Sequence, residues 1–142
     1  MPLVRISLLQ GKPADYRAAI GEAVHRAMVE TINCPPLDRF QVITEHARGD
    51  LVYDRTYLDI ARTDDVVFIQ ITLNAGRSVE MKRALYKRIA ELLGDNPGIR
   101  QQNVLINLVE VQKENWSFGN GLASYALYGQ TLRAGRTNHI FG

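Results

Sequence analysis

The fold is decided by a segment that begins Val66-Val67-Phe68-Ile69-Gln70-Ile71 and continues, two residues later, as Asn74-Ala75-Gly76-Arg77-Ser78-Val79-Glu80. The first part is an almost unbroken apolar run rich in β-branched residues, which is typical of a strand buried in a sheet. Gly76 interrupts it, and a second apolar run follows at residues 104–109. Between them, apolar residues recur at helical spacing: Ala84, Leu85, Ile89, Leu92 and Leu93. The segment therefore predicts a β-α-β unit.

The same order of signals occurs 65 positions earlier. Residues 3–8 alternate like a strand, Gly11-Lys12-Pro13 ends it, residues 19–28 carry a helical apolar stripe, and residues 40–44 resume strand periodicity. Proline fits the first position of a helix, so we expect Pro13 there. We predict one domain over residues 1–142, with pseudo-repeats at about 2–46 and 65–110. An insertion at 47–64 and a C-terminal hairpin and arm at 111–142 complete it.

Two β-α-β units predict an α/β fold with a four-stranded mixed or parallel sheet. The strands within a unit run parallel through right-handed crossovers, and both helices cover one face of the sheet. The other face is left bare. Apolar residues on both faces of the strands at 66–72 and 104–109 predict that this face is covered by oligomerisation.

Composition excludes several classes of protein. The 142 residues are 46% hydrophobic and carry a net charge of only +2, which excludes a disordered chain. The longest uncharged run, Val66 to Gly76, is about half of the roughly 20 residues that a membrane span needs. A pI of about 8.8 without basic clusters argues against a nucleic-acid partner.

The single cysteine, Cys34, excludes a disulfide scaffold and fits a reducing compartment. No signal peptide is evident at the N-terminus, so we expect a cytoplasmic protein. His25, His46 and His139 have no metal-ligand spacing, which argues against a zinc site. Glycine-rich dinucleotide and phosphate motifs are absent as well.

Pro2 is the first candidate for chemistry. A small second residue favours removal of Met1, which turns the proline amide into a secondary amine. A terminal amine titrates at about 7.7–8.0, close to neutral pH, and can act as general base, general acid or nucleophile. The alternative is that Pro2 merely leads a strand.

Two cations occupy equivalent places in the repeats. Arg77 stands at the predicted start of the second helix, where the helix dipole favours anions. A guanidinium beside free backbone N–H groups makes a carboxylate pocket, whereas the alternative is a solvated loop arginine. Lys12 is the matching cation of the first repeat, a second candidate for substrate binding with the same alternative.

Asp38 follows Pro35-Pro36-Leu37 and is a candidate for orienting or deprotonating a water molecule. It could equally cap a turn and pair with Arg39. Trp116 and Phe118 would share one face of a strand and wall an apolar pocket, or else clasp the tail.

Together, Met1-Pro2, the doubled β-α-β pattern and Gly76-Arg77-Ser78 resemble the tautomerase superfamily. Residues 74–82 look like the helix opening of 4-oxalocrotonate tautomerase, whose one-unit chain begins with the same proline. The two-unit length, Asp38-Arg39-Phe40-Gln41 and Asn115-Trp116-Ser117-Phe118-Gly119 look more like the malonate semialdehyde decarboxylase branch. One arginine, Arg77, stands where the best-known decarboxylase pattern has two, which weakens decarboxylation. A related decarboxylase subgroup also has one arginine, so decarboxylation stays an alternative.

The resemblance implies a homotrimeric barrel with sheets inside and helices outside, and no metal or organic cofactor. It also implies that Pro2 is the catalytic amine, Asp38 a water-positioning carboxylate and Arg77 the clamp for a substrate carboxylate. Trp116 and Phe118 would form the apolar wall.

Charge separates two modes of the same amine. If cations dominate, Pro2 is neutral and catalyses keto–enol tautomerisation of a small oxo or enol carboxylic acid, which is our primary prediction. If Asp38 lies close, Pro2 stays protonated, and hydration or malonate semialdehyde decarboxylation is the alternative. A further alternative is a non-enzymatic trimeric module that binds a metabolite.

Overall fold

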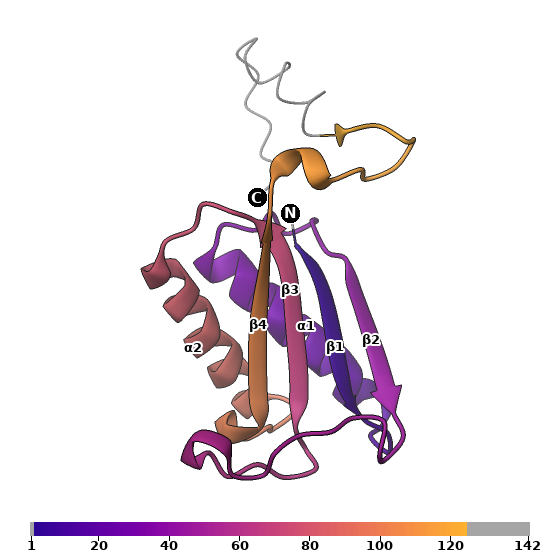
Figure 1. The fold of residues 1–142 in the computed structure, drawn as a ribbon, viewed down its shortest axis with the longest axis vertical. Coiled ribbons are helices and arrows are strands. Elements are labelled where there is room, and N and C mark those ends of the chain that lie inside the picture. Colours follow the sequence, from indigo (N-terminus) through magenta and orange to yellow (C-terminus); the bar gives the residue numbers. More distant parts are fainter. Residues whose placement is uncertain (1, 125–142) are drawn as a thin grey trace.

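The computed structural model describes residues 2–124, and its elements follow the predicted order (Figure 1). The helices are α1 (Ala14–Thr31) and α2 (Val79–Asp95). The strands are β1 (Leu3–Leu9), β2 (Gln41–His46), β3 (Val67–Asn74) and β4 (Val104–Val111). They form one sheet in the order β2-β1-β3-β4. The predicted fold class, two β-α-β units with a four-stranded mixed sheet, is confirmed.

The pairing register shows how closely the two units correspond. Val4 lies opposite Gln41 and Ile69 opposite Ile106, a separation of 37 residues in both parallel pairs (4 to 41, 69 to 106). Arg5 lies opposite Gln70, the residue 65 positions later in the chain. An approximate two-fold axis therefore passes through this last pair and relates one unit to the other. This axis makes β1 and β3 antiparallel, whereas the strands within each unit are parallel.

Both helices cover the same face of the sheet (Figure 1). Alternate strand residues point toward them, so every second residue of β1 and β3 is buried. Fully buried aliphatic side chains from the sheet and from the helices make one core: Val4, Ile6, Ile69, Ile71, Ile20, Val24, Leu85, Ile89 and Leu93. No helix in residues 2–124 is both long and apolar enough to cross a membrane.

The two helix starts differ in detail from each other. Pro13 is the N-cap of α1, with extended backbone, and not its first helical residue as predicted. Ser78 caps α2, because its hydroxyl oxygen accepts a hydrogen bond from the Met81 backbone N–H at 3.2 Å. Gly11 and Gly76 precede the two helices with φ of +112° and +121°, a conformation that only glycine adopts without strain. The repeated glycine therefore makes the same turn in both units.

The face of the sheet opposite the helices is bare in the single chain. On the outer strands β2 and β4, Val42, Leu105 and Val109 are exposed by 43%, 42% and 38%. The centre of the face is polar, since Arg5 and Gln70 stand at the two-fold axis. The prediction of apolar residues on both faces of the strand at 104–109 is confirmed by Leu105 and Val109, whereas the centre of the bare face is polar because of Arg5 and Gln70.

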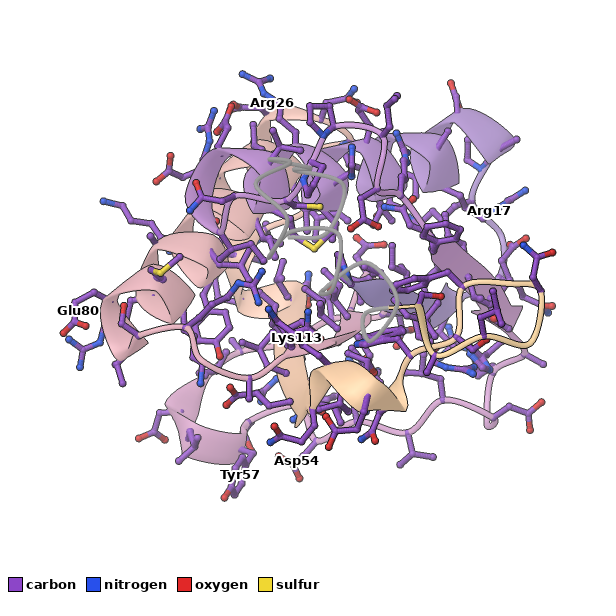
Figure 2. The ribbon with its side chains drawn as sticks, turned by 90° about the horizontal axis from the view of Figure 1, so that it is seen from above. Arg17, Arg26, Asp54, Tyr57, Glu80 and Lys113 are labelled. Atoms are coloured by element: carbon purple, nitrogen blue, oxygen red, sulfur yellow. The ribbon has the colours of Figure 1, made fainter. Side chains whose placement is uncertain are left out.

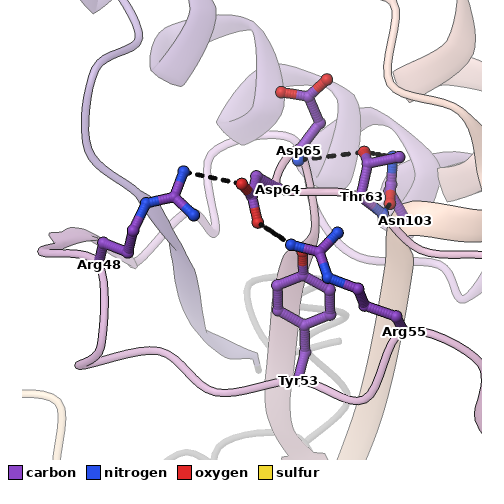
Figure 3. Close-up of polar contacts among 7 residues, drawn as sticks. All are labelled: Arg48, Tyr53, Arg55, Thr63, Asp64, Asp65 and Asn103. Carbon is purple, nitrogen blue, oxygen red and sulfur yellow. Dashed lines mark hydrogen bonds and ion pairs between the residues drawn. The ribbon is translucent and has the colours of Figure 1, made fainter.

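Residues 47–64, where an insertion is predicted, lie between β2 and β3, and Asp64 bonds to several of their side chains (Figure 3). Its carboxylate accepts hydrogen bonds from Tyr53 Oη, from Arg48 at 2.8 Å and from Arg55 at 3.1 Å. The hydrogen bond from Tyr53 is the largest cause that holds the pKa of Asp64 below its usual range, and the two arginines lower this pKa further. The insertion is thus an ordered loop built around one carboxylate.

The tail differs from the predicted hairpin over the part that the structure describes. After β4 the chain makes a 3₁₀ turn at Lys113–Asn115, and residues 112–124 contain no strand. The rest of the predicted hairpin and arm, residues 125–142, lies outside the described residues.

Candidate active site

The strand directions gather most of the predicted site residues at one end of the sheet. Because β1 and β3 are antiparallel, β1 and β2 begin at the end where β3 and β4 finish (Figure 1). Figure 2 views the molecule from this end, with Lys113 labelled in the turn that follows β4. The two units therefore both contribute to this end, although their sequences are far apart.

Pro2 is buried at the start of β1. On one side, the next residue, Leu3, lies opposite Thr72 near the end of β3. On the other side, the Val4 backbone N–H donates to the Phe40 carbonyl, just before β2, at 3.0 Å. Pro2 thus enters the sheet between the segment that carries Asp38 and the strand that leads to Arg77.

Asp38 lies in the turn that joins α1 to β2, and only 6% of it is exposed. Its backbone N–H donates to the Pro35 carbonyl at 3.0 Å and closes the turn. Burial raises the pKa of the carboxyl group, while the positive charges of the amino terminus and of His25 oppose this rise. Arg39 does not cap this turn with Asp38 but extends to Glu22 of α1 at 2.7 Å.

Two residues that sequence reasoning missed hold this turn. The buried His25 of α1 bonds through Nε2 to the Pro36 carbonyl at 2.8 Å, and since a carbonyl only accepts, Nε2 carries the proton. The Cys34 thiol donates to the Asp38 carbonyl at 3.4 Å. Burial raises the pKa of Cys34 to about 11, so the thiol stays protonated at neutral pH. The two prolines, Pro35 and Pro36, are the only sequence signal for a turn that needs such support.

Arg77 is half-buried at the start of α2. Its Nη1 donates to the Asn74 carbonyl at 3.0 Å and its Nη2 to the Ile32 carbonyl at 3.4 Å, while Nε is buried without a described partner. Both partners are neutral carbonyl groups, so these hydrogen bonds leave the positive charge of Arg77 without neutralisation. A hydrogen bond from Lys82 is the largest cause of the lowered pKa of Glu110, and the charge of Arg77 lowers this pKa slightly further. Arg77 thus faces the end of α1 with a positive charge suited to an anion.

Trp116 and Phe118 come together, but not as neighbours on a strand. They follow the 3₁₀ turn, and their rings stack with centroids 5.5 Å apart and an angle of 23° between planes. The indole Nε1–H donates to Asn74 Oδ1 at 2.8 Å. Asn74 is 4% exposed and is a further residue without a predicted role, because nothing in its local sequence distinguishes it.

Lys12 is the predicted site residue that a single chain does not bring to this end. It follows β1 at the far end of the sheet and pairs with Asp65 at 2.7 Å. This hydrogen bond is the largest cause of the raised pKa of Lys12, whose ammonium also lies 5.1 Å from the Tyr16 ring centre. Within a single chain Lys12 is therefore an ion-pair partner of Asp65, the residue that follows the insertion.

The residues at the far end of the sheet that correspond to the site residues in the other repeat lack the same reactive groups. At an offset of 65, Pro2 corresponds to Val67, an ordinary residue within the chain, and Asp38 to Asn103, an amide that does not titrate. Lys12 stands in the place of Arg77 and is already paired. Among residues 2–124, a buried proline at the start of a strand, a buried carboxylate and an arginine occur together at one end of the sheet alone. No group of three His, Cys, Asp or Glu residues in this range could hold a metal ion.

Two fused β-α-β units, with Pro2 buried at the start of β1 and Arg77 directly before the Ser78 cap of α2, define a class of two-unit folds that is typical of tautomerases. Two family models described as tautomerase enzymes match the chain, at residues 2–57 and 38–119. The chain belongs to the tautomerase family.

The relatives agree with this assignment. The chain is 40% identical over 123 residues to the probable tautomerase YusQ of Bacillus subtilis (strain 168), covering 87% of this chain and 97% of that protein. It is 30% identical to the probable tautomerase YrdN of the same organism, covering 88% and 96%.

Solved structures give the same result. The FG41 malonate semialdehyde decarboxylase inhibited by 3-bromopropiolate is 35% identical with a TM-score of 0.84, over 89% of this chain and 96% of that one. A second malonate semialdehyde decarboxylase, described with both decarboxylase and hydratase activities, is 32% identical with a TM-score of 0.83, over 90% and 98%. A fused 4-OT solved as a symmetric trimer has a TM-score of 0.71 over 88% and 98%, and at 22% identity it shows the fold alone.

Proposed function

We propose that this protein is a cofactor-independent tautomerase that uses the Pro2 amine to move a proton between carbon and oxygen of a small oxo or enol carboxylic acid. The observation that carries the proposal is the placement of buried Pro2 at the end of the sheet that also receives Arg77 and Asp38. Membership of the tautomerase family supports it.

Each side chain has a role in this proposal. Removal of Met1 frees the pyrrolidine nitrogen, which takes the enol hydroxyl proton and delivers a proton to carbon. Arg77 binds the substrate carboxylate, since its present partners are neutral carbonyls that an anion can replace. Trp116 and Phe118 pack against the carbon skeleton of the substrate. The reaction moves one proton and needs no redox or metal chemistry.

Hydration or decarboxylation of an oxo acid such as malonate semialdehyde is the second candidate. Asp38 favours it, because a buried carboxylate with a raised pKa is a stronger base toward water than an exposed one. The nearby carboxylate also favours a protonated Pro2, which would polarise a substrate carbonyl. Similarity to two malonate semialdehyde decarboxylases supports this candidate.

Substituting Asp38→Asn is expected to separate the two activities. The amide fits the same buried turn but cannot accept a proton, so hydration or decarboxylation should fall by about 10²–10⁴-fold. The rate of tautomerisation should change much less, because Pro2 and not Asp38 transfers the proton in that reaction. Steady-state rates on phenylenolpyruvate and on malonate semialdehyde measure the two losses. Equal losses in both reactions would assign Asp38 a structural role.

We also propose that three chains assemble with their bare sheet faces inward. Val42, Leu105 and Val109 are exposed on this face, and assembly would remove their apolar surface from water. Sedimentation equilibrium should then give three times the 16.0 kDa of one chain. A monomer at micromolar concentration would contradict this assembly.

The experiment that tests the proposed function is labelling with 3-bromopyruvate. The free amine of Pro2 should displace bromide and form a carbon–nitrogen bond, with complete loss of activity. Peptide mapping by mass spectrometry locates the adduct, and the Cys34→Ala variant removes the competing nucleophile and should still be labelled. An adduct elsewhere with activity intact contradicts the proposal. An intact mass that retains Met1 on the native protein favours the non-enzymatic binding module instead.

A further inference from the structure

We propose that Asn74 is a positioning residue that sets the spacing between the guanidinium of Arg77 and the indole of Trp116. It thereby selects which carboxylic acids the site accepts. This inference rests on the proposed function, because the two groups that Asn74 holds are the proposed carboxylate clamp and apolar wall. Asn74 donates no reacting group of its own and acts through these two neighbours.

The backbone of Asn74 is fixed by the sheet. It is the last residue of β3 and lies opposite Val111, the last residue of β4. The next residue, Ala75, donates its N–H to the Val111 carbonyl at 2.9 Å, so the pairing continues one residue beyond the strand. With 4% of its surface exposed, Asn74 has little freedom to move.

The main chain of Asn74 holds the guanidinium. Gly76, with φ of +121°, turns the chain back so that Arg77 Nη1 reaches the Asn74 carbonyl at 3.0 Å. This bond keeps the arginine against the end of β3 and not extended into solvent. The position of the Arg77 guanidinium is therefore fixed by Asn74.

The side chain of Asn74 holds the indole. Trp116 lies five residues beyond the end of β4, in a described stretch without strand pairing. Its Nε1–H donates to Asn74 Oδ1 at 2.8 Å, and an indole nitrogen can only donate. The Phe118 ring stacks on the indole, so the same bond orients both rings. Loss of the acceptor removes the hydrogen bond that joins the indole to the last residue of β3.

A substrate must then satisfy both groups at once. An acid whose carboxylate reaches Arg77 while its carbon skeleton lies along the indole fits the spacing that Asn74 imposes. Removing the side chain of Asn74 frees the rings and weakens substrate binding. It leaves the proton transfer at Pro2 unchanged. The expected signature is a rise in KM with a nearly constant kcat.

The first test uses the protein without substrate. Trp116 is the only tryptophan of the chain, so fluorescence excited at wavelengths that the six tyrosines do not absorb reports this residue alone. In Asn74→Ala, we expect a red-shifted emission and stronger quenching by acrylamide. Asn74→Asp keeps an acceptor oxygen and should give the emission of the parent protein. The control Asn103→Ala removes another buried asparagine acceptor, the partner of the Thr63 backbone N–H at 2.8 Å at the far end of the sheet, and should leave the emission unchanged.

The second test is a double-mutant cycle on KM with phenylenolpyruvate. Asn74→Ala should raise KM by about three- to tenfold, as expected for one lost neutral hydrogen bond. Trp116→Phe keeps an aromatic ring but removes the N–H donor. In that background Asn74→Ala should have little further effect, because the interaction is already absent. Additive effects would overturn the proposal, since Asn74 would then act independently of the indole.

The two tests fail separately. If no carboxylic acid is a substrate, the proposed function fails, but fluorescence still reports whether Asn74 holds the indole. If emission and quenching in Asn74→Ala equal those of the parent protein, the positioning role is overturned even when activity is present. If circular dichroism shows that Asn74→Ala is unfolded, the fluorescence of Asn74→Asp provides the test. An emission of Asn74→Asp that differs from that of the parent protein overturns the positioning role.

Discussion

A chain that keeps an extra residue on the Pro2 nitrogen is expected to lose about 10²–10⁴-fold in kcat, the usual contribution of a general acid or base. The physical reason is that an amide nitrogen does not titrate near neutral pH, whereas a terminal secondary amine does. A non-cleavable extension ahead of Pro2 creates this chain. The burial of Pro2 implies that such an extension also crowds the site.

A second comparison separates lost basicity from crowding. The same extended chain, carrying a protease site that ends directly before Pro2, should regain full activity on cleavage. Isothermal titration calorimetry with malonate, a non-reactive carboxylate, measures access to the site before and after cleavage. An uncleaved chain with undiminished kcat would contradict the assignment of Pro2 as the catalytic amine.

Arg77→Ala is expected to raise KM for carboxylate substrates by about 10–100-fold, the value of one charge-assisted hydrogen-bonded contact. The guanidinium has neutral carbonyls as its present partners, so it is available to an incoming carboxylate. Arg77→Lys keeps the charge but loses the planar fork, and should recover only part of the loss. Steady-state kinetics on phenylenolpyruvate measure KM for all three proteins.

The matched control for this substitution lies on the same helix. Arg83 is exposed on α2, and Arg83→Ala removes the same charge without touching the candidate site. Its KM should equal that of the parent protein, which excludes a general effect of net charge. An unchanged KM in Arg77→Ala would remove Arg77 from substrate binding.

The elements of this fold are readable from the chain because their signals are local. The apolar run at residues 66–71, the glycine at 76 and the helical stripe that follows predict β3, the turn and α2, and the structure has all three. β3 extends three residues further than the run, to Asn74, because pairing with β4 continues to Val111. The repeat at an offset of 65 also predicts the layout of four strands and two helices.

The candidate site is predicted less completely, because its assembly depends on which strands meet. Gly11-Lys12 and Gly76-Arg77 look alike in the sequence, yet the antiparallel pairing of β1 with β3 sends them to opposite ends of the sheet. Nothing local distinguishes Lys12, paired with Asp65, from Arg77, which meets the end of α1.

The sequence by itself determined the β-α-β units, their repetition and the residue types available for chemistry, since periodicity and turn residues act within a few positions of themselves. Only the tertiary structure decided that Pro2, Asp38 and Arg77 share one end of the sheet. It also decided that Asn74 bonds Trp116, 42 residues away, across two strand ends. Contacts of this kind follow from strand order and register, which are set by burial of the whole sheet against its helices and not by any one segment.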